Sequence, residues 1–285
     1  MKAFQTWFFS WIFPWVPKRL LSRSVGVMMR WPLPPPVRER ALRAFASAFG
    51  IGVAEAEQDL HAYASLDQFF TRRLKPGLRP VEAEFIHPVD GRLTESGVIA
   101  SGELIQAKGW TYPLAEFLGD TPLATHFEGG HYYTYYLCPA DYHRVHAPAP
   151  GELVSGKHIP GLLWPVNEWS VNNIRRLFCL NERVVLNFTS PAGRWSLVMV
   201  GATNVGHITV TLDPSITTNR WMWHAPSDRQ YTPPLPVRAG DEVGIFHLGS
   251  TVVCLFDRNF TRAQTGARAV RMGQCLGPPD KPLLR

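Results

Sequence analysis

Near the C-terminus the chain reads Gly244-Ile245-Phe246-His247-Leu248-Gly249-Ser250-Thr251 and continues as Val252-Val253-Cys254-Leu255-Phe256. This pattern predicts a strand that is interrupted at Gly249 and then resumes. A glycine inside a strand usually marks a β-bulge, which is one interpretation of the step. The other interpretation is chemical. Glycine adopts backbone angles closed to other residues, so the peptide after Gly249 can be exposed to attack by the Ser250 hydroxyl. Such an attack converts the peptide to an ester, and elimination then splits the chain.

The net charge of +6 is concentrated at the N-terminus. Residues 1–43 hold eight Lys and Arg against one acidic residue, and the remainder holds 21 against 22. This asymmetry argues against a nucleic-acid groove across the fold and favours an anionic membrane surface as a partner. With 45% hydrophobic residues, the 285-residue chain can bury the core of one large domain, with or without an appendage.

Metal and disulfide signals are weak. The two histidines His143 and His146 are three residues apart, a spacing that permits metal binding, but no second ligand pair is evident, and we predict no metal site. The cysteines are far apart and lack C-x-x-C spacing, which favours free thiols in a reducing compartment. They are Cys138, Cys179, Cys254 and Cys275.

The first residues predict a segment that lies on a bilayer. The apolar run of residues 4–16 is shorter than the roughly 20 residues a spanning helix needs, and Pro14 interrupts it. Tryptophan prefers the headgroup level of a membrane. Three tryptophans four residues apart share one helical face: Trp7, Trp11 and Trp15.

Basic residues follow this aromatic face. Lys18 and Arg19 come directly after it, as expected of a monotopic anchor on acidic lipid, although a solvated basic face is the simpler interpretation. A secretory signal is the alternative, but the only small-x-small triplet nearby, residues 22–24, follows these cations and no apolar core. We therefore expect residues 1–30 to form a membrane-interface anchor.

The rest of the chain predicts an α+β fold. After the stiff Pro-rich residues 31–36, helices are expected over 37–49 and from a capping box at Ser65 to about residue 74, so that residues 31–80 form a helical cover. Residues 81–285 are expected to form a β-rich, mostly antiparallel catalytic domain that closes into a barrel or sandwich. Candidate strands are 132–137, 151–157, 183–189, 195–200, 207–212 and 243–246.

Several stretches resemble the phosphatidylserine decarboxylases, in family order and over most of the chain after residue 60. The self-cleavage signature of that family matches Leu248-Gly249-Ser250-Thr251. The other matching stretches are His87-Pro88-Val89-Asp90-Gly91, Lys108-Gly109-Trp110-Thr111-Tyr112, Cys138-Pro139-Ala140-Asp141-Tyr142-His143-Arg144-Val145-His146-Ala147-Pro148 and Val200-Gly201-Ala202-Thr203-Asn204-Val205-Gly206.

The resemblance implies a proenzyme that splits between Gly249 and Ser250 into a large β chain, residues 1–249, and a small α chain, residues 250–285. Ser250 then becomes a pyruvoyl group, which is the cofactor and the site of the Schiff base with the substrate amine. The implied reaction is decarboxylation of phosphatidylserine to phosphatidylethanolamine and CO2, part of phospholipid biosynthesis. The implied location is peripheral, on the cytoplasmic face of the cell membrane, and a homodimer is allowed.

The resemblance also implies roles for single residues. Asp90, His146 and Ser250 correspond to a self-cleavage triad, in which a carboxylate orients the base that activates the serine. His143 corresponds to the acid-base group of the decarboxylation. Taken alone, Asp90 before Gly91 is typical of a turn, and both histidines have structural interpretations.

Two other functions compete with this one. A serine-type autoprotease or hydrolase would use the same Asp90, His146 and Ser250, although the absence of a G-x-S-x-G elbow disfavours an α/β-hydrolase. A membrane-bound, β-rich binding module would need no chemistry and would contain only a Gly-Ser bulge. Self-processing separates both enzymes from the binding module, and a fragment without a free amino group would indicate the decarboxylase.

Overall fold

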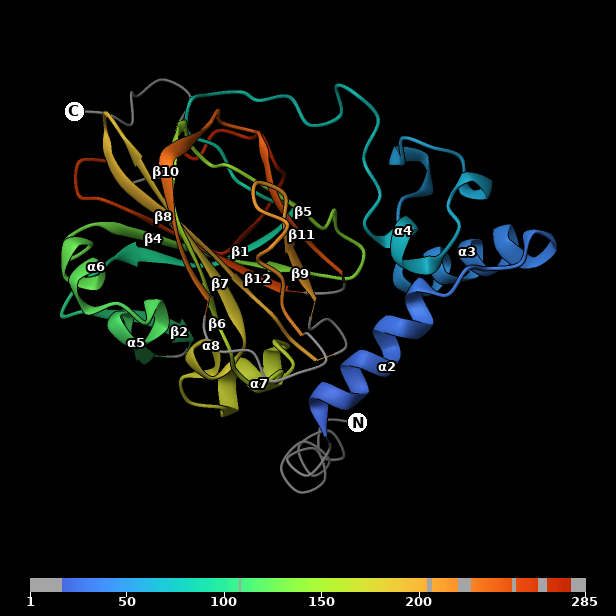
Figure 1. Ribbon diagram of the computed structural model, residues 1–285, viewed down its shortest axis with the longest axis horizontal. Helices are drawn as coiled ribbons and strands as arrows, with labels where there is room; N and C mark the ends of the chain where they lie inside the picture. Colours follow the sequence, from blue (N-terminus) through green and yellow to red (C-terminus); the bar gives the residue numbers. More distant parts are fainter. Residues whose placement is uncertain are drawn as a thin grey trace.

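The N-terminal helices form a unit of their own beside the sheets (Figure 1). The computed structural model describes residues 17–107, 109–203, 207–219, 227–247, 250–260 and 266–277. In the helical unit, Leu42, Phe69 and Phe70 are fully buried in a separate apolar cluster. Its elements are α2 (Lys18–Arg30), α3 (Pro35–Phe49), the 3-10 turns η3 (Val53–Glu55) and η4 (Leu60–Ala62), and α4 (Leu66–Phe70).

Local sequence explains where these helices begin and end. Prolines occupy the first turn of α3, where no backbone N–H is needed, and the helix ends at Gly50 with a φ of 70°. Ser65 caps α4 by accepting a hydrogen bond from the Gln68 backbone N–H, as the capping box predicts. The predicted continuation to residue 74 is wrong, because α4 ends at Phe70 and Leu74 forms a β-bridge with Ala56.

An eight-stranded antiparallel sheet is the centre of the molecule. Its strand order is β10-β6-β7-β8-β12-β4-β1-β13. The strands are β1 (Gly91–Val98), β4 (His131–Leu137), β6 (Gly151–Ile159), β7 (Arg183–Ser190), β8 (Gly193–Val200), β10 (Ser227–Val237), β12 (Ser250–Phe256) and β13 (Arg268–Val270). The strand that begins at Ser250 therefore lies inside the sheet, between β8 and β4.

A second sheet packs on one face of the first. It has the order β5-β11-β9, with β5 (Arg144–His146), β9 (Ile208–Val210) and β11 (Glu242–Phe246), and in Figure 1 it lies between the large sheet and the helical unit. Residues of both sheets share one apolar cluster, in which Val145, Phe246 and Val252 are fully buried.

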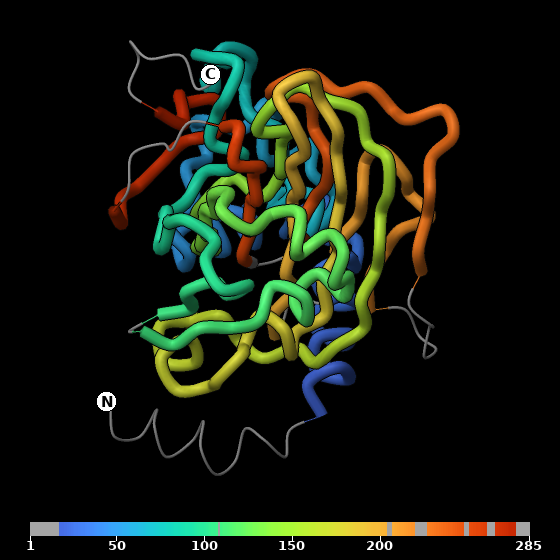
Figure 2. Tube along the Cα trace, turned by 90° about the vertical axis from the view of Figure 1, so that its left-hand side faces the viewer, coloured from blue at the N-terminus to red at the C-terminus, as the bar shows by residue number. Residues whose placement is uncertain are grey.

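The opposite face of the large sheet is covered by short elements, which are in front in Figure 2. Tyr112, Phe117 and Leu177 pack there against Val253 and Leu255 of β12. The covering elements are β2 (Glu103–Ala107), β3 (Trp110–Pro113), α5 (Leu114–Leu118), α6 (Thr121–His126), α7 (Glu168–Asn173) and α8 (Leu177–Leu180). Alternate residues of β12 thus enter two different cores, as the two-residue period of a strand requires.

The predicted α+β class is confirmed, with N-terminal helices followed by antiparallel sheets. The large sheet is open, with edges at β10 and β13, so the described strands close no barrel. All six predicted strands are present, although β9 is shorter than expected. In the part of the chain that the structure describes, no helix combines the length and apolar character needed to cross a membrane.

Candidate active site

Two connections that are far apart in the sequence span the same gap between the sheets. β4 ends at Leu137, which pairs with Ser250 at the start of β12. At the other side of the gap, the backbone N–H of Phe246 in β11 donates to the carbonyl oxygen of His143 at 3.0 Å. The β4–β5 connection therefore begins and ends beside the two residues that bound the step from Gly249 to Ser250, namely Ser250 and Phe246.

His143 is fully buried at the end of the β4–β5 connection. Its ring packs against Phe70 of α4, with ring centroids 4.1 Å apart. The Nδ1–H donates to the carbonyl oxygen of Asp141 at 2.8 Å, whereas Nε2 is buried and has no hydrogen-bond partner among the described residues. Burial lowers the pKa of His143 to about 3, so the ring is neutral at pH 7. Nε2 therefore presents a lone pair and no proton.

His146 has a hydrogen bond on each ring nitrogen. The Nδ1–H donates to the carbonyl oxygen of Gly240 at 2.7 Å, and the Tyr142 hydroxyl lies 3.2 Å from Nε2, with the two rings stacked. Because Nδ1 carries the proton, the hydroxyl donates to the Nε2 lone pair. Burial lowers the pKa of His146, and the Gly240 carbonyl partly opposes this. The backbone carbonyl thus orients the ring in the way a carboxylate does in a serine triad.

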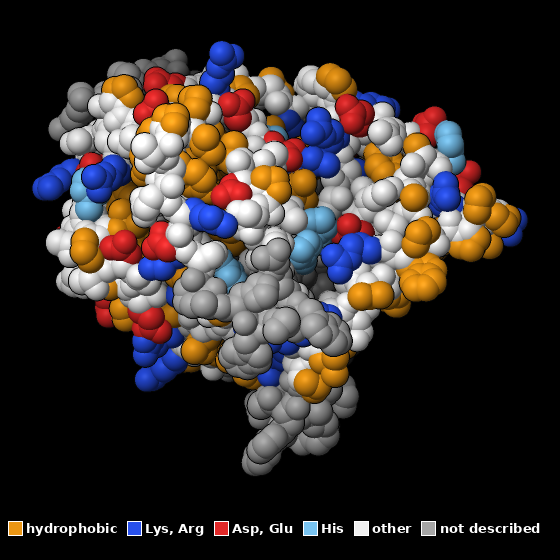
Figure 3. All heavy atoms as spheres, in the orientation of Figure 1, with side chains coloured by type: hydrophobic (Ala, Val, Ile, Leu, Met, Phe, Trp, Pro, Cys, Tyr) orange, Lys and Arg blue, Asp and Glu red, His pale blue; other side chains and the backbone are white. Residues whose placement is uncertain are grey.

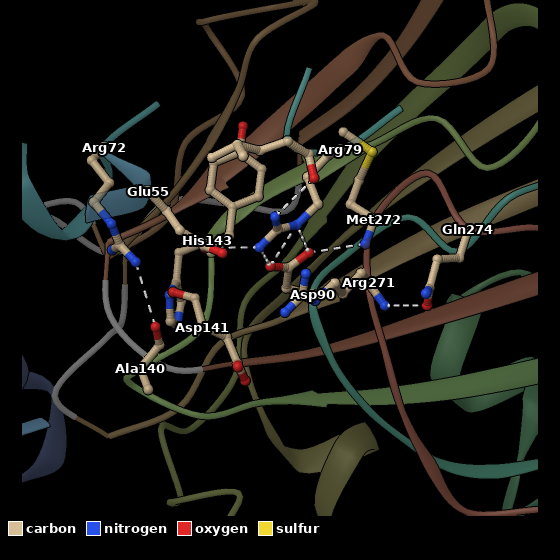
Figure 4. Close-up of polar contacts among 12 residues, drawn as sticks. Glu55, Arg72, Arg79, Asp90, Ala140, Asp141, His143, Arg271, Met272 and Gln274 are labelled. Atoms are coloured by element: carbon tan, nitrogen blue, oxygen red, sulfur yellow. Dashed lines mark hydrogen bonds and ion pairs between the residues drawn. The ribbon is translucent and has the colours of Figure 1, made fainter. Parts of the chain in front are cut away.

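Asp90 belongs to a charged cluster (Figure 4). Its carboxylate accepts hydrogen bonds from the Arg79 guanidinium at 2.5 to 3.0 Å and from the Met272 backbone N–H at 2.9 Å. Arg79 also pairs with Glu55 of the helical unit at 3.0 Å. The bond to Asp90 raises the pKa of Arg79, so this cation is permanently charged.

The glycine after Asp90 is required by packing. Gly91 has a φ of 146°, a conformation that side chains disfavour, and a Cβ there would collide with the carbonyl oxygen of Tyr136 on β4. The Asp-Gly pair therefore lets β1 approach β4 closely while the carboxylate faces Arg79.

The predicted triad residues are only partly connected in the described structure. Within the described ranges, Asp90 and His146 share no hydrogen bond, because each has the other partners given above. Ser250 begins β12, but its side chain and residues 248–249 lie outside what the structure describes. His143 lies at the strand ends that flank the predicted cleavage step.

Of the residues predicted to contact the membrane, two are described by the structure and three are not. Lys18 and Arg19 contact the sheet domain: the Lys18 ammonium lies 4.1 Å from the centre of the Trp164 ring, and Arg19 donates to the Gly161 carbonyl oxygen at 2.8 Å. Part of their charge therefore holds α2 to the sheet domain. The three predicted anchor tryptophans lie outside the described residues: Trp7, Trp11 and Trp15.

Two cavities flank this region. One of about 430 Å³ lies between the helical unit and the sheet domain, and Asp90, Arg72 and Tyr142 line it. Another of about 380 Å³ is lined by Thr251, the residue after Ser250, and by Tyr136 and Phe178. Both are large enough for a polar headgroup.

Sequence reasoning missed Arg79 and Tyr142. Arg79 is one of 29 basic residues in the chain, and nothing in the charge pattern distinguishes it. Tyr142 directly precedes His143 and lies four residues before His146, so an aromatic donor next to two histidines was an available signal.

Comparison with known proteins shows which family the chain resembles. The family model described as phosphatidylserine decarboxylase matches residues 66–278. The phosphatidylserine decarboxylase proenzyme of Anaeromyxobacter sp. (strain K) is 46% identical, over 92% of this chain and 95% of its own length. Those of Myxococcus xanthus (strain DK1622) and Shewanella loihica (strain ATCC BAA-1088 / PV-4) are 44% and 38% identical, over 85% and 93% of this chain and 86% and 96% of their own lengths.

Proposed function

The chain belongs to the phosphatidylserine decarboxylase family, and we propose that it matures by splitting its own backbone between Gly249 and Ser250. Its activity is the decarboxylation of phosphatidylserine to phosphatidylethanolamine, and its cofactor is a serine-derived pyruvoyl group. The proposal assigns that group to Ser250, which becomes the first residue of a small chain, residues 250–285, while residues 1–249 form the large chain.

The observation that carries the proposal is the strand register around the step. Leu137 holds Ser250 on one side, and the carbonyl of His143 holds Phe246 on the other. His143 is the last residue between β4 and β5, and His146 is the last residue of β5, three positions further on. Fixing the backbone on both sides of the step limits the ordering that the chain needs before it reacts.

In the proposed maturation, His146 is the general base for Ser250. The Ser250 hydroxyl loses its proton and attacks the Gly249 carbonyl carbon, so that the peptide C–N bond is exchanged for an ester C–O bond. Loss of the Ser250 Cα proton to a base then expels the Gly249 carboxylate and leaves a double bond in residue 250. This enamine tautomerises to an imine, and water hydrolyses the imine to a ketone and ammonia. The Gly240 carbonyl orients the His146 ring, and Tyr142 must give up its hydrogen bond to Nε2 before this nitrogen can take the proton.

Asp90 completes the proposed triad through its charge. Its carboxylate favours the protonated form of His146, as the weakest of the influences on the pKa of that ring. Because Arg79 and the Met272 N–H bind the carboxylate directly, Asp90 also fixes the loop around Met272. We assign Asp90 this double role, electrostatic toward His146 and structural toward the small chain.

One buried histidine, His143, suits the chemistry of a carbonyl cofactor. Once formed, the pyruvoyl group supplies a ketone that accepts the electron pair released when the substrate carboxylate leaves. The buried, unpartnered Nε2 of His143 is the group suited to proton transfer there. Because the ring is neutral, His143 must first accept a proton, and it then returns that proton to the substrate Cα.

Both chains stay together in this proposal. β12 of the small chain lies between β8 and β4 of the large chain, and β13 pairs with β1. Splitting the backbone at the start of β12 removes none of these ladders. The fragments are therefore expected to separate only under denaturing conditions.

Mass measurement of purified wild type and Ser250→Ala tests the proposal. Wild type should yield a denatured 36-residue fragment, residues 250–285, that lacks a free amino group, whereas Ser250→Ala should stay an intact chain of 285 residues. Cleavage of Ser250→Ala at the same step would refute the mechanism. A wild-type fragment with a normal N-terminal amine would refute the pyruvoyl assignment to Ser250.

We also propose that the protein binds the cytoplasmic face of the membrane through its helical unit. Hydrophobic side chains gather on the surface of this unit, at the right of Figure 3. On α2 and directly after it, Val27, Met28 and Trp31 are 55%, 60% and 67% exposed. A contiguous apolar surface of this kind is typical of a membrane-binding face.

Liposome flotation of a Met28→Ser/Trp31→Ser variant tests this surface. Removing two apolar side chains that enter the lipid boundary should weaken partition into anionic vesicles by roughly 30-fold, because each contributes about 1 kcal/mol when partly buried. The matched control is Leu78→Ser, which removes an exposed apolar side chain outside α2. Equal flotation of the double variant and the control would show that this face does not bind lipid.

A further inference from the structure

His247 lies two residues before Gly249 and joins three separate elements. Its Nδ1 is 2.9 Å from the carboxylate of Asp67 on α4, and its Nε2 is 3.3 Å from the hydroxyl of Thr209 on β9. The two side chains of the Asp67–His247 pair are only 13% and 18% exposed. A largely desolvated carboxylate needs a hydrogen-bond donor, and the Nδ1–H of His247 supplies it.

The backbone of His247 is fixed as well. Its N–H donates to the carbonyl oxygen of His207 at 3.0 Å, and the two imidazole rings are in contact, with centroids 4.7 Å apart. Both the main chain and the ring of His247 are therefore held in place, the main chain by the segment that leads into β9 and the ring by α4 and β9.

The step to Ser250 is correspondingly short. Only two residues separate His247 from Ser250, which the ladder with Leu137 fixes at the start of β12. Fixing both ends of so short a segment limits the backbone conformations open to it. An attack of a hydroxyl on the preceding carbonyl depends on such a limit, because the reacting atoms must stay within about 3.5 Å of each other.

We propose that Asp67 and His247 are positioning residues for the maturation step and hold the chain on the N-terminal side of the scissile peptide. The proposal rests on the self-cleavage described above. It makes the helical unit part of the maturation machinery, although Asp67 precedes the step by about 180 residues. Neither residue reacts, and the charge-assisted hydrogen bond between them is what ties α4 to the end of β11.

The test measures processing rates of full-length precursors in a pulse-chase translation, as the conversion of the 285-residue chain to its fragments. Asp67→Ala and His247→Leu remove the bond and should each slow processing roughly tenfold or more, the loss expected for a charge-assisted hydrogen bond. Asp67→Asn keeps an acceptor oxygen and His247→Asn keeps an N–H near the position of Nδ1, so both should stay within about threefold of wild type.

Two controls separate positioning from general destabilisation. Glu39→Ala removes an exposed ion pair with Arg43 on α3 and should leave the rate unchanged. The double variant Asp67→Ala/His247→Leu should be processed no more slowly than the slower single variant, because both substitutions remove the same hydrogen bond. Thermal unfolding of each precursor, carrying Ser250→Ala to prevent cleavage, reports how much of it is folded.

The idea fails if folded Asp67→Ala precursor splits at the wild-type rate, or if the two asparagine variants are as slow as the variants without the bond. Should Asp67→Ala not fold, the comparison of His247→Leu with His247→Asn decides in the same way. A wild-type chain that does not split at Gly249 would instead refute the proposed maturation itself, so the two failures are distinguishable.

Discussion

Asp90 and His143 differ in how many of their side-chain polar atoms have hydrogen-bond partners. Asp90 carries a charge and receives hydrogen bonds from Arg79 and from the Met272 backbone. His143 is neutral, and its Nε2 is buried without a hydrogen bond within the described residues. Burying an unpaired acceptor costs roughly 1 to 3 kcal/mol, so a protein keeps one mainly where a ligand or a reaction will use it.

This difference separates structural from chemical roles. A saturated carboxylate changes its protonation only if its partners move, whereas a free lone pair is ready to accept a proton. We therefore expect substitutions near His143 to affect chemistry, and substitutions near Asp90 to affect mainly the placement of other groups.

The largest effect is expected for His143→Ala. Loss of a positioned acid-base group lowers kcat by about 10²- to 10⁴-fold. The chain should still split, because His146 and not His143 is assigned to Ser250. Denaturing gels measure the splitting, and CO2 release from phosphatidylserine measures the turnover. His61→Ala, at an exposed position in the helical unit, is the matched control. Full activity of His143→Ala would remove the contrast between the two regions.

Much of the fold was predictable because it depends on local patterns. The Ser65 capping box, the glycine after α3 and the alternation along β12 each act within a few residues. Six of the described strands were not predicted: β1, β2, β3, β5, β10 and β13. The three-residue β5 and β13 exist only through their partners, and the eleven-residue β10 contains three prolines, which argue against a strand in the sequence alone. The open edges of the large sheet are likewise a tertiary result.

The candidate site shows the same limit. Family-like motifs marked His143 and Asp90 equally, since both are polar residues in matching stretches. Their difference comes from Arg79 and Phe70, which lie on other segments and which no spacing rule connects with them. The contact of Asp67 with His247, across about 180 residues, had no sequence signal at all.

The next largest effects are expected on the rate of self-cleavage in the variants Asp90→Asn and His146→Ala, which compare the roles of these two residues. Loss of the general base in His146→Ala should slow cleavage by about 10²-fold or more. Asp90→Asn should slow it only about tenfold, because the Gly240 carbonyl continues to orient His146. The measurement is the half-time of precursor loss after synthesis. Equal, severe defects in the two variants would mean that Asp90 acts on His146 directly, and that its pairing with Arg79 gives way during the reaction.

The smallest effect concerns acid stability, and it distinguishes neutral buried histidines from the charged cluster. Burial lowers the pKa of both His143 and His87 from about 6.5 to about 3. Below pH 6.5 these histidines bind protons in the unfolded chain but not in the folded chain. The free energy of unfolding that they contribute at neutral pH is therefore lost as the pH falls from 6.5 toward 3. Each site should contribute a slope of about 1.4 kcal/mol per pH unit in this window.

Urea unfolding of the uncleaved Ser250→Ala precursor at a series of pH values measures this slope. Adding His143→Leu should reduce it by about one such contribution, whereas His61→Leu, at an exposed position, should leave it unchanged. An undiminished slope in the His143→Leu variant would mean that His143 titrates in the folded protein as it does in the unfolded chain, and its buried nitrogen would then hold a proton in mildly acidic solution.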